Sequence, residues 1–182
     1  MWPPESADID GSGGLIIWPF MIGRFKLRFE HLVEINDPGS PALEPLTADQ
    51  LWQGLVLRAE SPELFVLGLD RAEIVERGDG WIGRVLHFGK ASVRDRVVYE
   101  PRSAVRYETA ATAEHAGGTL TMIIETPTPS ALLVRFIYET TLPNVDESGD
   151  DRYAEIVKSA YHEADLDTVR KIREIAATGQ LG

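Results

Sequence analysis

The side chains best placed for chemistry are an arginine and an aspartate on two neighbouring predicted strands. If Gly89 and Lys90 form a two-residue hairpin turn, Arg84 lies directly opposite Asp95 across the two strands. The other residues on that face are apolar, so it is predicted to face the core: Ile82, Leu86, Phe88, Ala91, Val93 and Val97. The pair is then either an ion pair that fixes the strand register or a polar anchor on a cavity floor. An anchor there would orient a ligand carboxylate, phenol or ketone.

Strand alternation brings further polar side chains to the same inner face. Tyr99 and Tyr107 fall there on the next two predicted strands, and Tyr138 and Thr140 fall there on the last one. Tyrosines on an apolar face are usually core residues whose hydroxyl finds a partner, and pocket lining is the alternative. His31 lies on the apolar side of the first strand, where it is either a hydrogen-bonded core residue or a general base. We treat all five as candidate ligand-binding groups.

A long amphipathic helix, expected at residues 148–179, must cover these side chains. Its apolar stripe has small residues at the centre and larger ones toward its ends: Val157, Ala160, Tyr161, Ala164, Thr168, Ile172 and Ile175. Small side chains that face a sheet either let the backbones approach closely or leave a void for a ligand. We therefore expect Ala160, Tyr161 and Ala164 to face the sheet and to line ligand-binding volume.

The remaining chain predicts an α+β domain. Alternating residues from Phe25 predict a first strand, and the Thr47/Gln50 capping box and the Ser61–Pro62 pair each begin a short helix. Six further strands follow with short links, so neighbouring strands are expected to be antiparallel: 71–77, 81–88, 91–100, 104–110, 119–126 and 131–140. The expected architecture is a helix-grip fold, in which a seven-stranded antiparallel sheet wraps around the long C-terminal helix.

The first 23 residues differ in composition from the rest of the chain. They are rich in Pro, Gly, Ser and acidic residues up to Gly14, and we expect residues 1–23 to be a flexible N-terminal extension of a single domain at 24–182. Their apolar part, residues 15–22, is either an extra packed element or a leader upstream of a natural start at Met21.

Composition limits the possible partners. The 182 residues carry 18 Lys and Arg against 29 Asp and Glu, and the resulting net charge of −11 disfavours nucleic acids and anionic lipid surfaces. The chain has no cysteine, so it has neither a disulfide framework nor a thiol nucleophile. The four histidines lack metal-ligand spacing, and no cofactor motif is present, so we expect neither a metal nor a cofactor.

Two apolar features of the sequence bear on membrane and protein contacts. Residues 15–22 are too few to span a bilayer and are broken by Pro19, so we expect no membrane insertion and a cytoplasmic location. On the outer face of the sheet, Ile123, Leu133 and Ile137 mark either a homodimer contact or the place where residues 15–22 pack.

Six segments resemble the AtaL-like branch of the START-type, birch-pollen-allergen-like (SRPBCC, polyketide cyclase-like) superfamily: residues 29–36, 51–60, 76–80, 93–97, 138–143 and 157–161. The resemblance covers about residues 24–181 and departs at the N-terminus, since such domains begin near Phe29. It implies the helix-grip fold, with a cavity between sheet and long helix that in relatives takes lipids, polyketides or other apolar molecules. It supplies no catalytic motif, and the superfamily includes carriers, cyclases and chaperone regulators, so fold does not decide function.

We therefore predict that the domain binds a small, largely apolar molecule, such as a lipid or a polyketide-like compound, between sheet and helix. One alternative is a polyketide cyclase or aromatase-like enzyme, in which the same polar groups would polarise a ketone and move a proton. Another is a protein-interaction module, similar to the chaperone regulators, that acts through the outer face of the sheet.

Overall fold

The computed structural model describes residues 24–36, 44–112, 117–143 and 152–181. Its elements in chain order are β1 (Arg24–Asn36), α1 (Ala48–Glu60), the 3-10 helix η1 (Pro62–Leu64), β2 (Arg71–Gly78), β3 (Trp81–Phe88), β4 (Ala91–Glu100), β5 (Ala104–Thr109), β6 (Gly118–Thr128), β7 (Ala131–Pro143) and α2 (Arg152–Ala177). The second expected short helix is thus a single 3-10 turn. The proposed extension at residues 1–23 lies outside the described residues.

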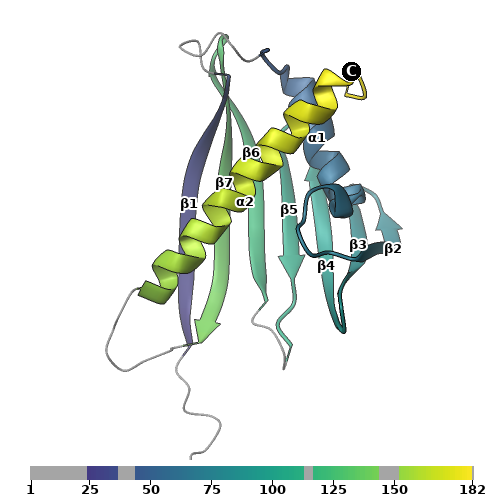
Figure 1. The fold of residues 1–182 in the computed structure, drawn as a ribbon, viewed down its shortest axis with the longest axis vertical. Coiled ribbons are helices and arrows are strands. Elements are labelled where there is room, and N and C mark those ends of the chain that lie inside the picture. Colours follow the sequence, from purple (N-terminus) through teal and green to yellow (C-terminus); the bar gives the residue numbers. More distant parts are fainter. Residues whose placement is uncertain (1–23, 37–43, 113–116, 144–151, 182) are drawn as a thin grey trace, which may run out of the picture.

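All seven strands form one antiparallel sheet, with the order β1-β7-β6-β5-β4-β3-β2. Strands β2 to β7 follow one another as a meander, and β1 joins the sheet beside the last strand. Figure 1 shows both α-helices on one face of this sheet, with α2 crossing the strands diagonally and α1 lying over the side that carries β4 and β5. The predicted helix-grip fold is confirmed.

The β3–β4 hairpin has the predicted register. Arg84 pairs with Asp95, and the neighbouring pairs on the same face join apolar residues. Gly89 in the turn has a φ of +58°, a left-handed value that glycine adopts without a steric penalty. A tight turn of this kind sets which residues face each other, so the position of the Arg84–Asp95 pair follows from local sequence.

Helix α1 begins at the predicted capping box. The Thr47 hydroxyl accepts from the Gln50 backbone at 3.1 Å, and the Gln50 side chain accepts from the Thr47 backbone at 2.9 Å. Further along the helix, a Cβ added at Gly54 would lie 2.6 Å from the Ile172 side chain. Glycine therefore allows the middle of α1 to approach the C-terminal part of α2 closely.

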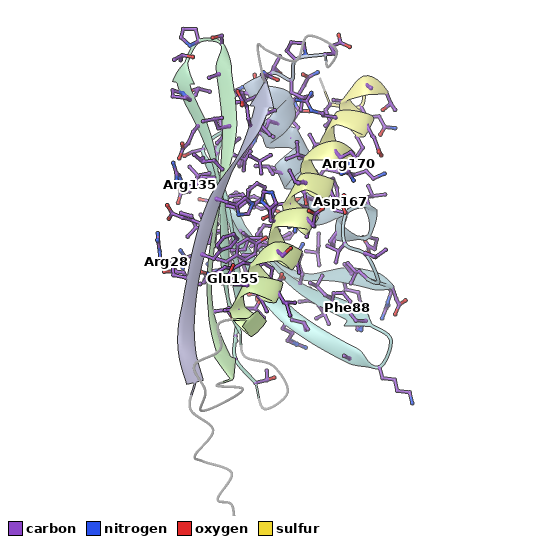
Figure 2. All side chains as sticks on the ribbon, turned by 60° about the vertical axis from the view of Figure 1, so that its left-hand side comes forward. Arg28, Phe88, Arg135, Glu155, Asp167 and Arg170 are labelled. Atoms are coloured by element: carbon purple, nitrogen blue, oxygen red, sulfur yellow. The ribbon has the colours of Figure 1, made fainter. Side chains whose placement is uncertain are left out.

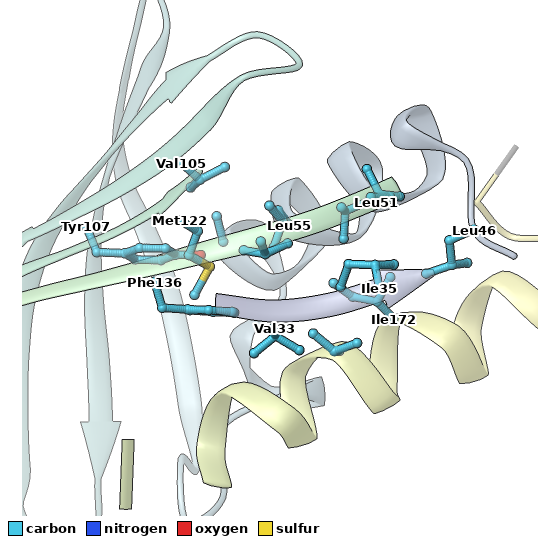
Figure 3. Packing of buried hydrophobic residues seen from close by; sticks show 14 of the residues in the cluster. Val33, Ile35, Leu46, Leu51, Leu55, Val105, Tyr107, Met122, Phe136 and Ile172 are labelled. Atoms are coloured by element: carbon cyan, nitrogen blue, oxygen red, sulfur yellow. The ribbon is translucent and has the colours of Figure 1, made fainter. Parts of the chain in front are cut away.

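The core fills the space between the sheet and the two helices (Figure 3). Phe136, Met122 and Val134 come from the sheet, Leu55 comes from α1, and all four are completely buried. Ile172 of α2 meets them from the other side (Figure 3). This apolar layer anchors the C-terminal half of α2 and leaves its N-terminal half over a more polar part of the sheet.

The rotation of α2 about its axis differs from the prediction. Ala160 and Ala164 are exposed, so the expectation that they face the sheet is wrong. Asp165 and Thr168 are the buried residues at the centre of the helix instead, with 0% and 1% of their surface exposed. Because successive helical residues lie about 100° apart, exchanging Ala164 for Asp165 turns the inward stripe by roughly a quarter of a turn.

The outer face of the sheet carries ion pairs. Figure 2 shows Arg28 and Arg135 on the side of the sheet away from α2, and Arg135 pairs there with Glu125 and Glu30 at 2.6 and 3.4 Å. The predicted apolar residues Ile123, Leu133 and Ile137 are half-buried among these charges. Their proposed role as a homodimer contact stays a prediction. Within the described parts of the chain, no helix combines the length and apolar character needed to span a bilayer.

Candidate ligand-binding site

A cavity of about 350 Å³ lies between the sheet and the helices. Its walls come from β3 to β7, the end of α1, the segment around η1, and α2, and it is open to solvent on one side. Leu86, Val93 and Leu120 supply apolar surface. Most of the predicted polar candidates also line it: Arg84, Asp95, Tyr107, Tyr138, Thr140 and Tyr161. The volume falls within the range of pockets that hold small organic molecules.

The Arg84–Asp95 pair is buried and satisfied. Arg84 Nε and Nη2 donate to the two oxygens of Asp95 at 2.9 and 2.5 Å, and the two side chains are only 3% and 5% exposed. Arg84 Nη1 donates to the carbonyl oxygen of Ala59 at 2.5 Å. That carbonyl belongs to the last turn of α1, where helix carbonyls lack an intrahelical partner. The pair thus joins β3 to β4 and ties both strands to α1.

A second buried carboxylate, on α2, has no such cation. Tyr138 donates its hydroxyl to Asp165 Oδ1 at 2.7 Å, and His31 Nε2 lies 3.2 Å from Asp165 Oδ2. Neither Oδ2 nor the ring nitrogens of His31 make a hydrogen bond within the described part of the chain. Burial raises the pKa of Asp165 to about 7, although the Tyr138 hydrogen bond and the charge of Arg58 act in the opposite direction. Near neutral pH, Asp165 therefore exists in both protonation states.

His31 lies behind the cavity wall. Its ring stacks between Phe29 and Phe136, with centroids 5.1 and 5.3 Å away, and meets His162 edge-on at 4.8 Å. Burial, followed by the charge of His162, lowers the pKa of His31, so the imidazole is neutral at physiological pH. His31 does not line the cavity and contacts the site through Asp165.

Aromatic rings bring the cavity walls together. The Tyr138 and Tyr161 rings are stacked, with centroids 4.1 Å apart and planes 6° apart, which brings Tyr161 of α2 against β7. Tyr107 lies between two arginines, whose guanidinium carbons are 5.0 Å (Arg58) and 5.2 Å (Arg84) from its ring centroid. Its buried hydroxyl makes no hydrogen bond to any described residue. An unpartnered buried donor at a cavity wall is uncommon in native proteins.

Two predicted candidates remain, Thr140 and Tyr99. Thr140 lines the cavity and donates its hydroxyl to the carbonyl of Gly117 at 2.8 Å, so it also closes the start of β6 onto β7. Tyr99 faces inward but packs against Trp52 of α1 at 6.5 Å and is not part of the cavity wall. Burial raises the pKa of Tyr99, so its hydroxyl stays protonated. The ligand-binding roles of all these residues stay predictions.

Sequence reasoning missed Arg58 and Asp165. Arg58 lies in the last turn of α1 and lines the cavity, where its Nε donates to the Thr168 hydroxyl at 3.3 Å. The spacing of Leu51, Leu55 and Arg58 already placed this arginine on the apolar face of its helix. Likewise, Tyr161, Asp165 and Thr168 are spaced as one helical stripe. A charged residue at an inward helical position was the signal in both cases.

Among residues 24–36, 44–112, 117–143 and 152–181, no three His, Asp or Glu side chains are grouped so that they could hold a metal ion. The cavity instead presents hydroxyl groups, guanidinium groups and apolar surface, which suits an organic molecule.

Known structures share this architecture. The ZhuI aromatase/cyclase from Streptomyces sp. R1128 is 17% identical, with a TM-score of 0.59 over 84% of this chain and 94% of that one. Norcoclaurine synthase from Thalictrum flavum, in truncated form, is 10% identical, with a TM-score of 0.57 over 86% and 96%. The di-domain aromatase/cyclase StfQ from the steffimycin pathway is 15% identical, with a TM-score of 0.62, and this chain covers 84% of itself but only 52% of StfQ. At these identities the likeness concerns the fold alone.

Sequence comparison identifies the family. No curated protein sequence matches the chain. The family model described as acetylaranotin biosynthesis cluster protein L (AtaL) matches residues 33–179, which include both α-helices and every strand except residues 24–32 of β1. This chain therefore belongs to the AtaL family.

Proposed function

We propose that this protein binds a small, largely apolar organic molecule in the cavity between its sheet and α2. The cavity itself carries the proposal, because its volume of about 350 Å³ suits a small organic molecule and both apolar and polar side chains converge on it. Leu86, Val93 and Leu120 would contribute apolar contact, and burial of ligand surface against them would supply most of the binding free energy. Neighbours described as aromatase/cyclases and norcoclaurine synthase support an organic molecule of this size, for example a polyketide-like compound or a lipid.

The polar groups would orient the ligand. Arg84 already has Asp95 and the Ala59 carbonyl as partners, so in this proposal it shapes the floor and offers only a polarised surface. Tyr107 and Tyr138 line the cavity from β5 and β7 and are the tyrosines nearest to ligand oxygens in this proposal. Few polar groups in a mainly apolar pocket fix orientation without making desolvation too costly.

One observation favours a second function, a cyclase-like enzyme. Tyr138 lines the cavity, and its hydroxyl donates a hydrogen bond to Asp165. The pKa of Asp165, about 7, suits proton transfer at neutral pH. A ligand enol or hydroxyl that donates to the Tyr138 oxygen could pass its proton to Tyr138 while Tyr138 passes its own to Asp165. Turnover of a bound polyketide-like molecule that disappears in Tyr138→Phe, with binding retained, would establish the enzyme. The open cavity gives no support to the chaperone-regulator alternative.

A matched pair of variants tests the binding proposal. Val93 and Val98 are both half-buried on β4, but Val93 lines the cavity and Val98 is on the opposite face of the strand. We expect the neutral fluorescent probe N-phenyl-1-naphthylamine to bind the protein saturably. Val93→Trp should weaken that binding by roughly tenfold or more because the indole fills the cavity, and Val98→Trp should not.

Two further measurements complete this test. Cooperative thermal melting of both variants establishes that each is folded, and native mass spectrometry of freshly purified wild type looks for a co-purifying small molecule. Absence of saturable probe binding, or equal binding by the two variants, would contradict the proposal.

A further inference from the structure

Arg58 differs from the other arginine of the cavity in having no counter-ion. Arg84 is paired with Asp95 through two hydrogen bonds. Arg58, by contrast, makes no ion pair with any carboxylate of the described residues; its Nε donates to the neutral Thr168 hydroxyl, and its other polar neighbour is the Tyr107 hydroxyl. A guanidinium group in a partly desolvated site without an anion is costly, because desolvation is repaid only by a well-placed opposite charge.

The surroundings hold the Arg58 guanidinium in place without neutralising it. Its carbon lies 5.0 Å from the ring centroid of Tyr107, and Thr168 fixes Nε from α2. Thr168 in turn donates to the Ala164 carbonyl at 2.9 Å, so the hydroxyl is itself held in place. Burial lowers the pKa of Arg58, but Tyr107, Tyr138 and Asp165 together outweigh it and leave the pKa above its usual value. The group is therefore a fixed cation on a side chain that lines the cavity.

The other charged groups nearby do not neutralise the Arg58 guanidinium. Asp95 is engaged by Arg84. Asp165 is the remaining buried acid, but it accepts from Tyr138, forms no ion pair with Arg58 and, with a pKa of about 7, is charged only part of the time at neutral pH. A second unsatisfied group lies beside the cation, since the buried Tyr107 hydroxyl has no hydrogen-bond partner among the described residues. Arg58, which lines the cavity, thus offers N–H donors from which an oxyanion can accept, with the buried Tyr107 hydroxyl beside it.

We propose that the occupant of the cavity is an anion: an apolar body that carries a carboxylate or a similar singly charged oxyanion, bound by Arg58 with Tyr107 beside it. This inference rests on the proposed binding function and narrows it to a ligand class. The apolar part of the ligand lies against Leu86, Val93 and Leu120, and its charged end points toward the last turn of α1.

Two probes that differ in charge separate this inference from the binding function itself. The first is 8-anilinonaphthalene-1-sulfonate, whose sulfonate stays ionised across the accessible pH range. The second is N-phenyl-1-naphthylamine, the same ring system without the sulfonate. Both are titrated into the wild type, Arg58→Met, Arg58→Lys and Arg170→Met. Arg170 is the matched control, because it is exposed on α2, pairs with Asp167 and does not line the cavity.

We expect Arg58→Met to lower the affinity for the anionic probe by roughly ten- to a hundredfold, which is the range of a hydrogen-bonded charge pair. The affinity for the neutral probe should change by no more than about twofold. Arg58→Lys should restore part of the loss, since it keeps the charge but not the fork of donors. Arg170→Met should change neither probe. Val93→Trp should abolish binding of both probes, which places them in the same cavity. If Arg58→Met does not melt cooperatively, Arg58→Gln takes its place.

The possible failures are distinguishable. Equal effects of Arg58→Met on the two probes, or no effect on either, would overturn the anion inference while leaving the binding function standing. Loss of anionic-probe affinity in Arg170→Met of the same size would also overturn it, because net charge alone would then explain the preference. Failure of the wild type to bind either probe would contradict the proposed binding function, and the anion inference with it.

Discussion

The two buried carboxylates of the cavity region, Asp95 and Asp165, are stabilised in opposite ways. Asp95 shares two hydrogen bonds with the guanidinium group of Arg84 on the next strand. Asp165 has the Tyr138 hydroxyl on one oxygen and only the poorly aligned His31 ring near the other. A buried carboxylate with a bidentate cation stays an ion, whereas one without a direct cation relieves its desolvation by taking up a proton.

This difference separates a structural role from a labile one. The Arg84–Asp95 pair joins two strands and one helix, so its charges contribute to the architecture that surrounds the cavity. Asp165 joins α2 to β7 through a group whose protonation changes near neutral pH. The cavity thus has a fixed floor, and behind its Tyr138 wall lies a carboxyl group that titrates near neutral pH.

The largest effect is expected at the paired carboxylate. Arg84→Met and Asp95→Leu should each lower the free energy of unfolding by about 3–5 kcal/mol, because each leaves a buried charge without its partner. The double variant should recover much of that loss, since two apolar residues leave no unpaired charge. Urea unfolding at pH 7 measures all three variants.

Arg106→Met serves as the control for this series. Arg106 pairs with Glu108, but both side chains are more than 40% exposed, so its loss should cost less than about 1 kcal/mol. Additive losses in the double variant, with no recovery, would show that Arg84 and Asp95 contribute independently and that the comparison with Asp165 is unsound.

The second prediction concerns the sign of the effect at the other carboxylate. The folded-state pKa of Asp165, about 7, lies above its ordinary value of 3.8, so the folded protein retains a proton that the unfolded chain releases as the pH rises. The wild type should therefore lose up to about 4 kcal/mol of stability from this group between pH 4 and pH 7. Asp165→Asn cannot titrate and can still accept a hydrogen bond from Tyr138. Its free energy of unfolding should therefore increase relative to that of the wild type as the pH rises.

The relevant measurement is the difference in unfolding free energy between Asp165→Asn and the wild type at pH 4, 5.5, 7 and 8. Other titrating groups are shared by the two proteins and cancel in that difference. A difference that is constant with pH, or that shifts in favour of the wild type at high pH, would show that Asp165 is ionised in the folded protein and stabilised like Asp95.

The smallest effect is expected at the hydrogen bond that joins the cavity to Asp165. Tyr138→Phe removes the only donor to Oδ1 among the described residues and should cost about 1–3 kcal/mol. That hydrogen bond lowers the pKa of Asp165, so its loss should extend the pH-dependent decline in stability above pH 7. Tyr99→Phe is the control, because the Tyr99 hydroxyl has no hydrogen bond within the described residues and its removal should be nearly neutral. Equal losses in the two variants would argue against a specific role for the Tyr138 hydroxyl.

The amino-acid sequence alone determined the paired carboxylate and its surroundings. Strand alternation and a two-residue turn act over a few residues, so they specify that Arg84 faces Asp95 and that Tyr107 and Tyr138 point inward. The order of strands and helices, together with short links, likewise predicts the antiparallel sheet and the covering helix. These features depend on local geometry, which a sequence records directly.

Only the tertiary structure decided which residues at the centre of the long helix are buried against the sheet. Alanine occurs both in cores and on surfaces, so Ala164 does not by itself indicate which way α2 is rotated. Burial of the neighbouring Asp165 is unexpected from sequence, because burying a carboxylate usually costs free energy. The contact of Gly54 with Ile172 and the hydrogen bond from Tyr138 select the observed rotation. Both involve residues far apart in the chain. Arg58 meets Thr168 and Tyr107 for the same reason, because three separate elements must pack before the charge and its unpartnered neighbour come together.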